Sequence, residues 1–105
     1  MDNQLQKKET LEGYVVDIAC LRNIPALQLS KRAKEHTTAC ALMGHCIESG
    51  YGLVDIENRI MLLDSEATPR IVGLLKETTM EKGVQLKVER EKQKGKMKTT
   101  KVFHA

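Results

Sequence analysis

The alternation of residues 84–91, VQLKVERE, constrains the fold more than any other stretch of this chain. Val84, Leu86 and Val88 recur at every second position with polar residues between them, which predicts a half-buried strand with these three side chains facing inward. The following KQKGK places Gly95 at a predicted turn, and MKTTKVF has the composition of a final strand. The end of the chain is therefore expected to be two strands joined by a tight turn.

Three earlier regions show further patterns. Residues 10–19, TLEGYVVDIA, are rich in β-branched residues and predict a first strand. Residues 53–56 and 59–63 are two short apolar runs around Glu57 and Asn58, which is typical of a hairpin with a tight turn. A helix is expected next, with Thr68 as its cap, Pro69 in its first turn, Ile71, Leu74, Leu75 and Thr78 on one stripe, and Gly83 at its end.

This order of elements indicates the fold class. Five short strands with one helix between the third and fourth are the chain order of the OB-fold, a small, partly open barrel. We therefore expect a mainly β, α+β protein with a five-stranded OB-like barrel, and the alternative is a different α+β sandwich of the same strands. A chain of 105 residues makes one domain, here residues 10–105 after a flexible N-terminus of residues 1–9.

A helical insertion is expected between the first and second strands, at residues 20–50. Pro25 permits a helix start, ALQLSKRAKEH has helix-forming composition, and the next stretch is helical in composition as far as Met43. Gly44 and Gly50 are both plausible stops. OB-folds commonly bind ligands at the loop between these strands, which makes the insertion the first candidate for a functional site.

The insertion also concentrates the reactive side chains of the protein. Cys20, His36, Cys40, His45 and Cys46 lie within it, and only one further histidine occurs elsewhere. Thiolate and imidazole are ligands that zinc prefers, and Cys20, His36, Cys40 and Cys46 would form a tetrahedral set. We therefore predict a metal site, with zinc as the metal.

The helical spacing of these residues makes the prediction more specific. On one unbroken helix His36 and Cys40 would share a face, because four residues advance about 400°. Cys46 would turn away from them unless Gly44 breaks the helix. His45 and Asp17 are alternative ligands, and Asp17 is otherwise expected to cap the turn before Cys20 or to hydrogen-bond a ligand histidine.

Other roles for the cysteines remain open. In an oxidising compartment Cys20 could pair with Cys40 or Cys46 in a disulfide that holds the insertion to the barrel. The cysteines could also be buried and inert. A nucleophilic Cys40 with His36 as its base is a further hypothesis, but no segment supplies an oxyanion hole or a cofactor motif, so we expect no enzymatic activity.

Two stretches, GYVVDIAC and HTTACALMGHCIESGYGLV, precede a KGVQLKVE strand. They contain in order Asp17, Cys20, His36, Cys40, Cys46 and Gly50. In this order the chain resembles a group of small, mostly uncharacterised bacterial proteins in which Gly, a hydrophobic pair, Asp and Cys precede His, two Cys and Gly. The resemblance covers most of residues 12–103 and implies an OB-like barrel and a site, without an activity. Many members of the group are exported.

The final hairpin is a second candidate site. Residues 82–105 carry eight basic and two acidic side chains, and Lys92, Lys94, Lys96 and Lys98 cluster around the predicted turn. OB-folds bind single-stranded nucleic acid through a positive groove with stacking aromatic side chains. Because the chain has only two tyrosines, one phenylalanine and no tryptophan, nucleic-acid binding is the alternative function.

The remaining patterns bear on location and partners. No apolar run approaches the length of a membrane span, and the first twelve residues lack the apolar core of a signal peptide. A cytoplasmic protein is expected from the chain as printed, or an exported one if a leader has been removed. The sequence indicates no particular partner. We predict a small non-enzymatic binding module that holds zinc; the alternative is an oligonucleotide-binding OB domain whose cysteines form a structural disulfide or are inert.

Overall fold

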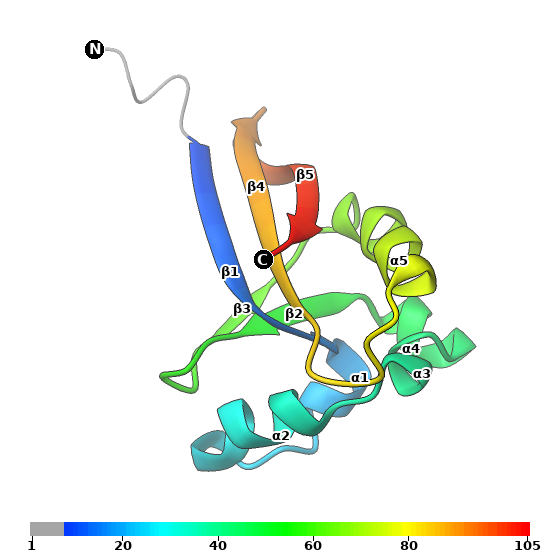
Figure 1. Ribbon diagram of the computed structural model, residues 1–105. Helices are drawn as coiled ribbons and strands as arrows, with labels where there is room; N and C mark the ends of the chain where they lie inside the picture. Colours follow the sequence, from blue (N-terminus) through cyan, green and yellow to red (C-terminus); the bar gives the residue numbers. More distant parts are fainter. Residues whose placement is uncertain (1–7) are drawn as a thin grey trace.

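The computed structural model describes residues 8–105, which form a single antiparallel sheet with helices at one end and on one face (Figure 1). Its strands are β1 (Lys8–Asp17), β2 (Tyr51–Val54), β3 (Ile60–Leu62), β4 (Gln85–Gln93) and β5 (Lys96–His104). They lie in the spatial order β3-β2-β1-β4-β5. One helix, α5 (Ala67–Glu77), connects β3 to β4. The predicted α+β class and the predicted order of five strands and one helix are confirmed.

The β4–β5 hairpin follows the alternation of its sequence. Val84, Leu86 and Val88 are buried, as predicted. The turn residues Lys94 and Gly95 have φ angles of 52° and 83°. Two consecutive left-handed residues form a tight turn whose twist matches that of the paired strands, and the predicted turn at Gly95 is confirmed.

The β2–β3 hairpin is also present, with bounds that differ from the prediction. β2 begins at Tyr51 and ends at Val54, two residues earlier than expected, and β3 is limited to Ile60–Leu62. Asn58 has a φ of 65° in the connecting turn, a conformation that asparagine adopts more easily than most residues.

The sheet is open, so a closed barrel is not formed. β3 and β5 are the two edges of the sheet, and β3 has only three residues before the chain leaves toward α5. The register of β4 and β5 shifts after Glu89, which leaves Thr100 as an extra residue in a β-bulge. The bulge directly follows Thr99, the residue of β5 that contacts Asp64 after β3.

Side chains connect the two edges where backbone pairing is missing. Asp64, which follows β3, accepts hydrogen bonds from the backbone N–H of Thr99 at 2.9 Å and from its hydroxyl at 2.7 Å. Arg90 of β4 donates to the carbonyl of Leu62 at 3.3 Å. Burial acts to raise the pKa of Asp64, but hydrogen bonds led by those from Thr99 outweigh it and hold the pKa below 3.8. Asp64 therefore ties β3 to β5 as a carboxylate.

Replacing Asp64 with alanine is expected to lower the free energy of unfolding at neutral pH by about 2 kcal/mol, because two hydrogen bonds to a buried threonine are lost. The lowered pKa means that Asp64 stabilises the fold above its unfolded-state pKa of about 3.9. This stabilisation is lost as the pH falls through the lower pKa of the folded state. Urea denaturation at a series of acidic pH values should show the difference between wild type and variant shrinking.

Asp55 provides the control for this variant. Its carboxylate also accepts backbone hydrogen bonds, but from Glu57 and Arg59 of its own turn. Asp55→Ala is expected to destabilise the protein less, because no contact between distant strands is lost. Equal losses for the two variants would contradict a role for Asp64 in holding the sheet edges together.

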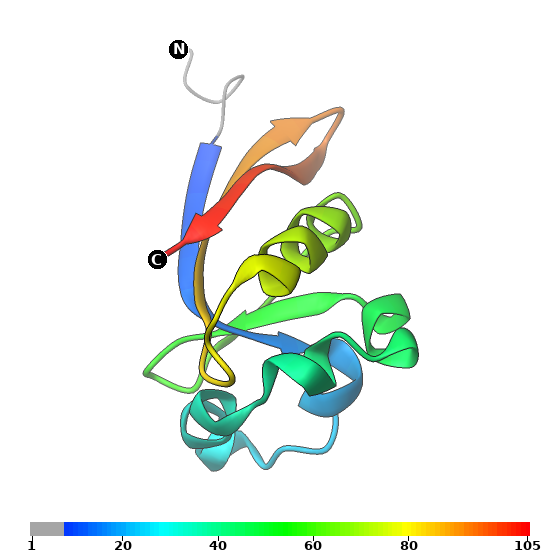
Figure 2. The same ribbon diagram turned by 45° about the vertical axis from the view of Figure 1, so that its right-hand side comes forward.

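Helix α5 lies against one face of the sheet, between the β4–β5 hairpin and β2 (Figure 2). It buries Ala67, Ile71 and Leu75 in one hydrophobic cluster with residues of the sheet such as Leu53 and Leu86. The predicted apolar stripe is thus confirmed at Ile71 and Leu75, which are buried, and at the partly buried Leu74, which packs against the same cluster.

The predicted bounds of α5 are wrong. The helix begins at Ala67 without a side-chain cap, so Thr68 lies inside it. It ends at Glu77 because Thr78 has an extended backbone, with ψ of 148°. Gly83, the predicted stop, instead lies in the loop before β4 with φ of 66°.

The helical insertion between β1 and β2 is present, but its helices are shorter than predicted. They are α1 (Ile18–Leu21), the 3-10 helix η2 (Ala26–Gln28), α2 (Leu29–Glu35), α3 (Thr38–Ala41) and α4 (Gly44–Ser49). The two ends of the insertion meet, because Asp17 pairs with Tyr51 in the sheet and the N–H of Ile18 donates to the carbonyl of Gly50 at 2.9 Å. A second hydrophobic cluster holds the insertion to the sheet and contains Val16, Leu21, Leu29, Ala33 and Val54.

Residues 1–7 of the predicted flexible terminus lie outside the described part of the chain, whereas Lys8 and Glu9 belong to β1. The predicted first strand extended to Ala19, but β1 ends at Asp17, where α1 begins. Within residues 8–105, no helix combines the length and the apolar composition needed to cross a membrane.

Candidate metal centre

All three cysteines occupy the third residue of a short helix in the insertion: Cys20 in α1, Cys40 in α3 and Cys46 in α4. The residue before each helix has an extended backbone, with ψ of 148°, 148° and 145° at Asp17, Thr37 and Met43. The Asp17 carboxylate accepts a hydrogen bond from the N–H of Cys20 at 2.9 Å, as predicted for a cap. The Thr37 hydroxyl accepts one from the N–H of Cys40 at 3.1 Å. Each thiol therefore belongs to the first turn of its own helix.

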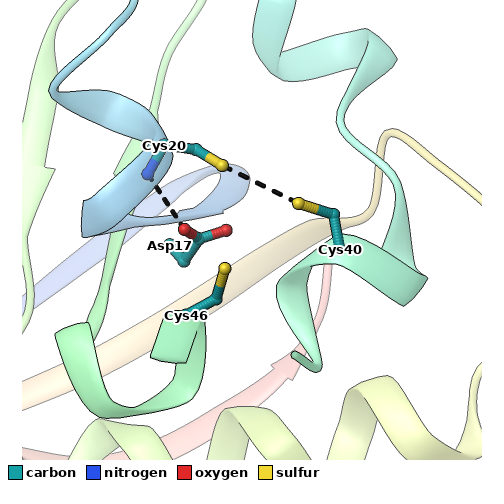
Figure 3. A group of neighbouring side chains, drawn as sticks. All are labelled: Asp17, Cys20, Cys40 and Cys46. Carbon is teal, nitrogen blue, oxygen red and sulfur yellow. Dashed lines mark hydrogen bonds between the residues drawn. The ribbon is translucent and has the colours of Figure 1, made fainter. Parts of the chain in front are cut away.

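The three cysteines converge on Asp17 (Figure 3). One donor atom from each of Asp17, Cys20, Cys40 and Cys46 lies within 4.8 Å of the other three. The sulfurs of Cys20 and Cys40 are 3.7 Å apart, and all three cysteines are free thiols. The structure thus brings together three of the four predicted ligands and places Asp17 beside them.

Asp17 and His36 form a hydrogen-bonded pair in which Asp17 is buried and His36 is half-buried. The Asp17 side chain is 0% exposed, and its Oδ1 is 2.8 Å from Nε2 of His36, while its Oδ2 accepts the hydrogen bond from Cys20. His36 was predicted as a ligand, but it is not one of the four mutually close donors. Because its imidazole hydrogen-bonds a carboxylate rather than a thiol, the geometry lends no support to His36 as the base for a nucleophilic Cys40.

The electrostatics of the cluster favour protonated thiols beside an ionised carboxylate. Burial raises the pKa of Cys20 to about 12, with further contributions from Cys40 and Asp17. Burial likewise raises the pKa of Cys46 to about 11, and Asp17 adds to the effect. Burial also acts to raise the pKa of Asp17, but hydrogen bonds from the Cys20 backbone and His36 outweigh it and lower the pKa. A cation at the centre of the cluster would instead favour the thiolate form of the cysteines, because its charge offsets the repulsion between the thiolates and the carboxylate.

The loop before β4 holds the connection between α2 and α3 in place. The N–H of Gly83 donates to the carbonyl of His36 at 3.1 Å, and the N–H of Thr38 donates to the carbonyl of Glu81 at 2.8 Å. Gly83 has a φ of 66°, and a Cβ atom there would lie 2.8 Å from the backbone oxygen of Lys34. Glycine is therefore required at this point of contact with the insertion.

Tyr51 holds the other end of α3. Its hydroxyl donates a hydrogen bond of 2.6 Å to the carbonyl of Ala41, the last residue of that helix. Burial raises the pKa of Tyr51 to about 12, so the hydroxyl keeps its proton and remains a donor. The helix that carries Cys40 is thus fixed from both sides.

One side of the cluster opens into a surface cleft of about 320 Å³. Cys20, Cys40 and His36 line this cleft, together with Arg32 and Asn23. Cys46 is only 1% exposed. Two of the donors are thus accessible from solvent, and the other two lie beneath them.

Two other groups of predicted site residues lie outside the four donors. His45 is exposed, and its Nε2 is 3.5 Å from the sulfur of Cys46. The four lysines of the predicted basic site are Lys92, Lys94, Lys96 and the half-buried Lys98. They surround the β4–β5 turn, at the end of the molecule opposite the insertion (Figure 1). Tyr51, one of the three aromatic residues, is buried and unable to stack on a base. Binding of nucleic acid at these lysines stays a prediction.

Asp17, which the sequence predicted as an alternative ligand or as a partner of one, lies among the four donors, and the sequence carries a local signal for its position. DIAC and TTAC each set a cysteine three residues after a good helix-capping residue. Two capped first turns within 24 residues indicate that both thiols project from the same kind of local structure, the first turn of a short helix.

No family model, curated protein or solved structure matches the chain. The function is therefore argued from the site itself.

Proposed function

We propose that this protein is a small, non-enzymatic binding module that holds a zinc ion through Cys20, Cys40, Cys46 and Asp17. The observation that carries the proposal is the convergence of these four donor atoms within 4.8 Å of one another. They come from two separate stretches of the chain, 17–20 and 40–46, which only the fold brings together. A chain of this size also gains stability from a bound metal, which links its insertion to its sheet.

The spacing of the donors suits zinc. In a tetrahedral site with zinc–sulfur bonds of about 2.3 Å, neighbouring sulfurs lie about 3.8 Å apart. The sulfurs of Cys20 and Cys40 are 3.7 Å apart. The other donor pairs are at most 4.8 Å apart, about 1 Å more than the sulfur–sulfur distance of a tetrahedral zinc site. Small rotations about the side-chain torsions can bring these donor atoms that much closer together.

The donor types also suit zinc. Three thiolates and one carboxylate combine soft and hard ligands, and zinc accepts both in a four-coordinate site. His36 supports the set by holding Oδ1 of Asp17, as hydrogen-bond partners commonly orient a metal ligand.

We infer further that the fold is OB-like. β1 pairs with both β2 and β4, and the single helix α5 follows β3, which is consistent with the OB order of elements. Asp64 and Arg90 link the end of β3 to its neighbours across the open seam. In this arrangement the metal site belongs to an enlarged loop between the first two strands, where OB domains commonly bind ligands.

Elemental analysis tests the proposal directly. Protein made without an affinity tag and kept reduced is expected to contain about one zinc per chain. Cys40→Ser and Cys46→Ser should both lose the metal, because each removes one of the four donors. His104→Ala is the matched control, since this histidine is exposed, ends β5 and lies outside the set. Wild-type protein without bound zinc, or zinc lost equally from His104→Ala, would contradict the proposed donor set.

A further inference from the structure

The four donors of the proposed metal site differ in their access to solvent. Cys20 and Cys40 line the surface cleft, whereas Cys46 and Asp17 are 1% and 0% exposed. A small molecule that enters the cleft therefore meets these two thiols and not the third.

The two accessible thiols are also neighbours. Their sulfurs are 3.7 Å apart, and a disulfide bond is about 2.05 Å long, so a small approach joins them. Cys20 lies on the four-residue helix α1 and Cys40 on the four-residue helix α3. Because contacts at both ends hold α3 in place, the approach falls to the cysteine side chains, whose torsions can move the sulfurs while the helices stay where they are.

The charges around the cleft select an anionic reagent. Arg32 and Glu35 both line it, but Glu35 forms an ion pair with Lys82 at 3.2 Å. Within residues 8–105 no carboxylate pairs with the guanidinium of Arg32, so this group can bind a carboxylate of a ligand, for which its planar, forked geometry is well suited.

We propose that the cleft is a reaction site for a small disulfide that carries carboxylates, and that this reagent oxidises Cys20 and Cys40 to an intramolecular disulfide and so releases the metal ion. The release of the metal ion rests on the proposed function, whereas the oxidation of Cys20 and Cys40 does not. Once the bond forms, only Cys46 and Asp17 remain of the four donors, and two ligands do not hold zinc in a structural site.

The chemistry is thiol–disulfide exchange in two steps. One protein thiolate attacks a sulfur of the reagent, which forms a mixed disulfide and expels the first small thiolate. The second protein thiolate then attacks the protein sulfur of this mixed disulfide, which forms the Cys20–Cys40 bond and expels the second small thiolate. The two cysteines lose two electrons, the reagent gains them, and the expelled thiolates take protons from water. In the metal-loaded protein both sulfurs are already thiolates, the form that attacks.

The experiment treats reduced, zinc-loaded protein with oxidised glutathione in the absence of oxygen. A zinc-sensitive dye is expected to show about one zinc released per chain, and mass spectrometry a loss of two hydrogens. Peptide mapping should place the bond between Cys20 and Cys40, and reduction should restore zinc binding. Arg32→Ala should slow the reaction with oxidised glutathione several-fold but leave the reaction with the neutral 2-hydroxyethyl disulfide unchanged.

The possible failures are distinguishable. Zinc that stays bound after oxidation, a bond that includes Cys46, or a stable mixed disulfide as the end product would overturn this inference and leave the zinc site standing. Reduced protein that holds no zinc overturns the proposed function instead, and that measurement comes before any oxidant is added. Cys46→Ala, expected to hold no zinc, should still form the Cys20–Cys40 bond, because both sulfurs of that bond and the 3.7 Å distance between them do not depend on Cys46.

Discussion

Replacing Asp17 with alanine is expected to abolish zinc binding and to lower the free energy of unfolding of the metal-free protein by about 3 kcal/mol. The Asp17 carboxylate caps α1 through the N–H of Cys20 and hydrogen-bonds His36 inside the protein. Loss of a helix cap costs about 1 kcal/mol, and loss of the buried hydrogen bond of His36 costs about 2 kcal/mol. Denaturant titration measures the stability, and competition with a chromophoric chelator measures the affinity for zinc.

Two variants separate these roles of Asp17. Asp17→Asn keeps an oxygen that can accept the cap hydrogen bond from Cys20, so it should recover part of the stability but not the zinc binding. His36→Ala keeps all four donors and is expected to weaken zinc binding by about 10- to 100-fold, as for loss of a partner that orients a ligand. Zinc binding by Asp17→Asn at wild-type strength would show that the carboxylate is not a ligand.

Replacing Gly83 with alanine is expected to destabilise the protein by about 3 kcal/mol and to weaken the metal site. Its φ of 66° is costly for alanine, and the added Cβ would lie 2.8 Å from the backbone oxygen of Lys34. Because Gly83 also donates to the carbonyl of His36, a displaced loop would shift the connection between α2 and α3. Thermal denaturation and the chelator competition report on the two effects.

Gly95 is the matched control for Gly83. Its φ of 83° is just as unfavourable for alanine, but a Cβ atom there has no neighbour within 4 Å. Gly95→Ala is therefore expected to cost about 1 kcal/mol and to leave zinc binding unchanged. Equal effects of the two substitutions would mean that the contact between the loop and the insertion does not position the site.

The sheet was predictable from the sequence because its patterns are local. The alternation through Val84, Leu86 and Val88 fixes which side of β4 faces the core, and Gly95 supplies the turn that follows. The open seam was not predictable, because it depends on how far apart the edges β3 and β5 lie. Asp64 looks like an ordinary turn residue until the fold brings it to Thr99.

The candidate site was predictable in its cysteines but not in its geometry. On one unbroken helix His36 and Cys40 would share a face, yet Thr37 has an extended backbone and starts a new helix there. The predicted break near Gly44 is confirmed, and it brings Cys46 to the cluster. Asp17 was expected as a cap, as a partner of histidine or as an alternative ligand. Its position beside three thiols depends on contacts between α1, α3 and α4, which no local pattern encodes.

The pairing of Asp17 with Tyr51 has a consequence for how such a protein can change. Residues 18–50 leave the sheet after Asp17 and return to it at Tyr51, its paired residue. For the rest of the sheet they are therefore equivalent to the loop of a β-hairpin. A segment of this kind can be lengthened, exchanged or transplanted to another hairpin without altering the strand register. The host would need to supply a carboxylate in the place of Asp17, a hydroxyl in the place of Tyr51 and a glycine loop in the place of Gly83. With those three supports the segment could be moved as a unit, and the rest of the sheet could diverge in sequence independently.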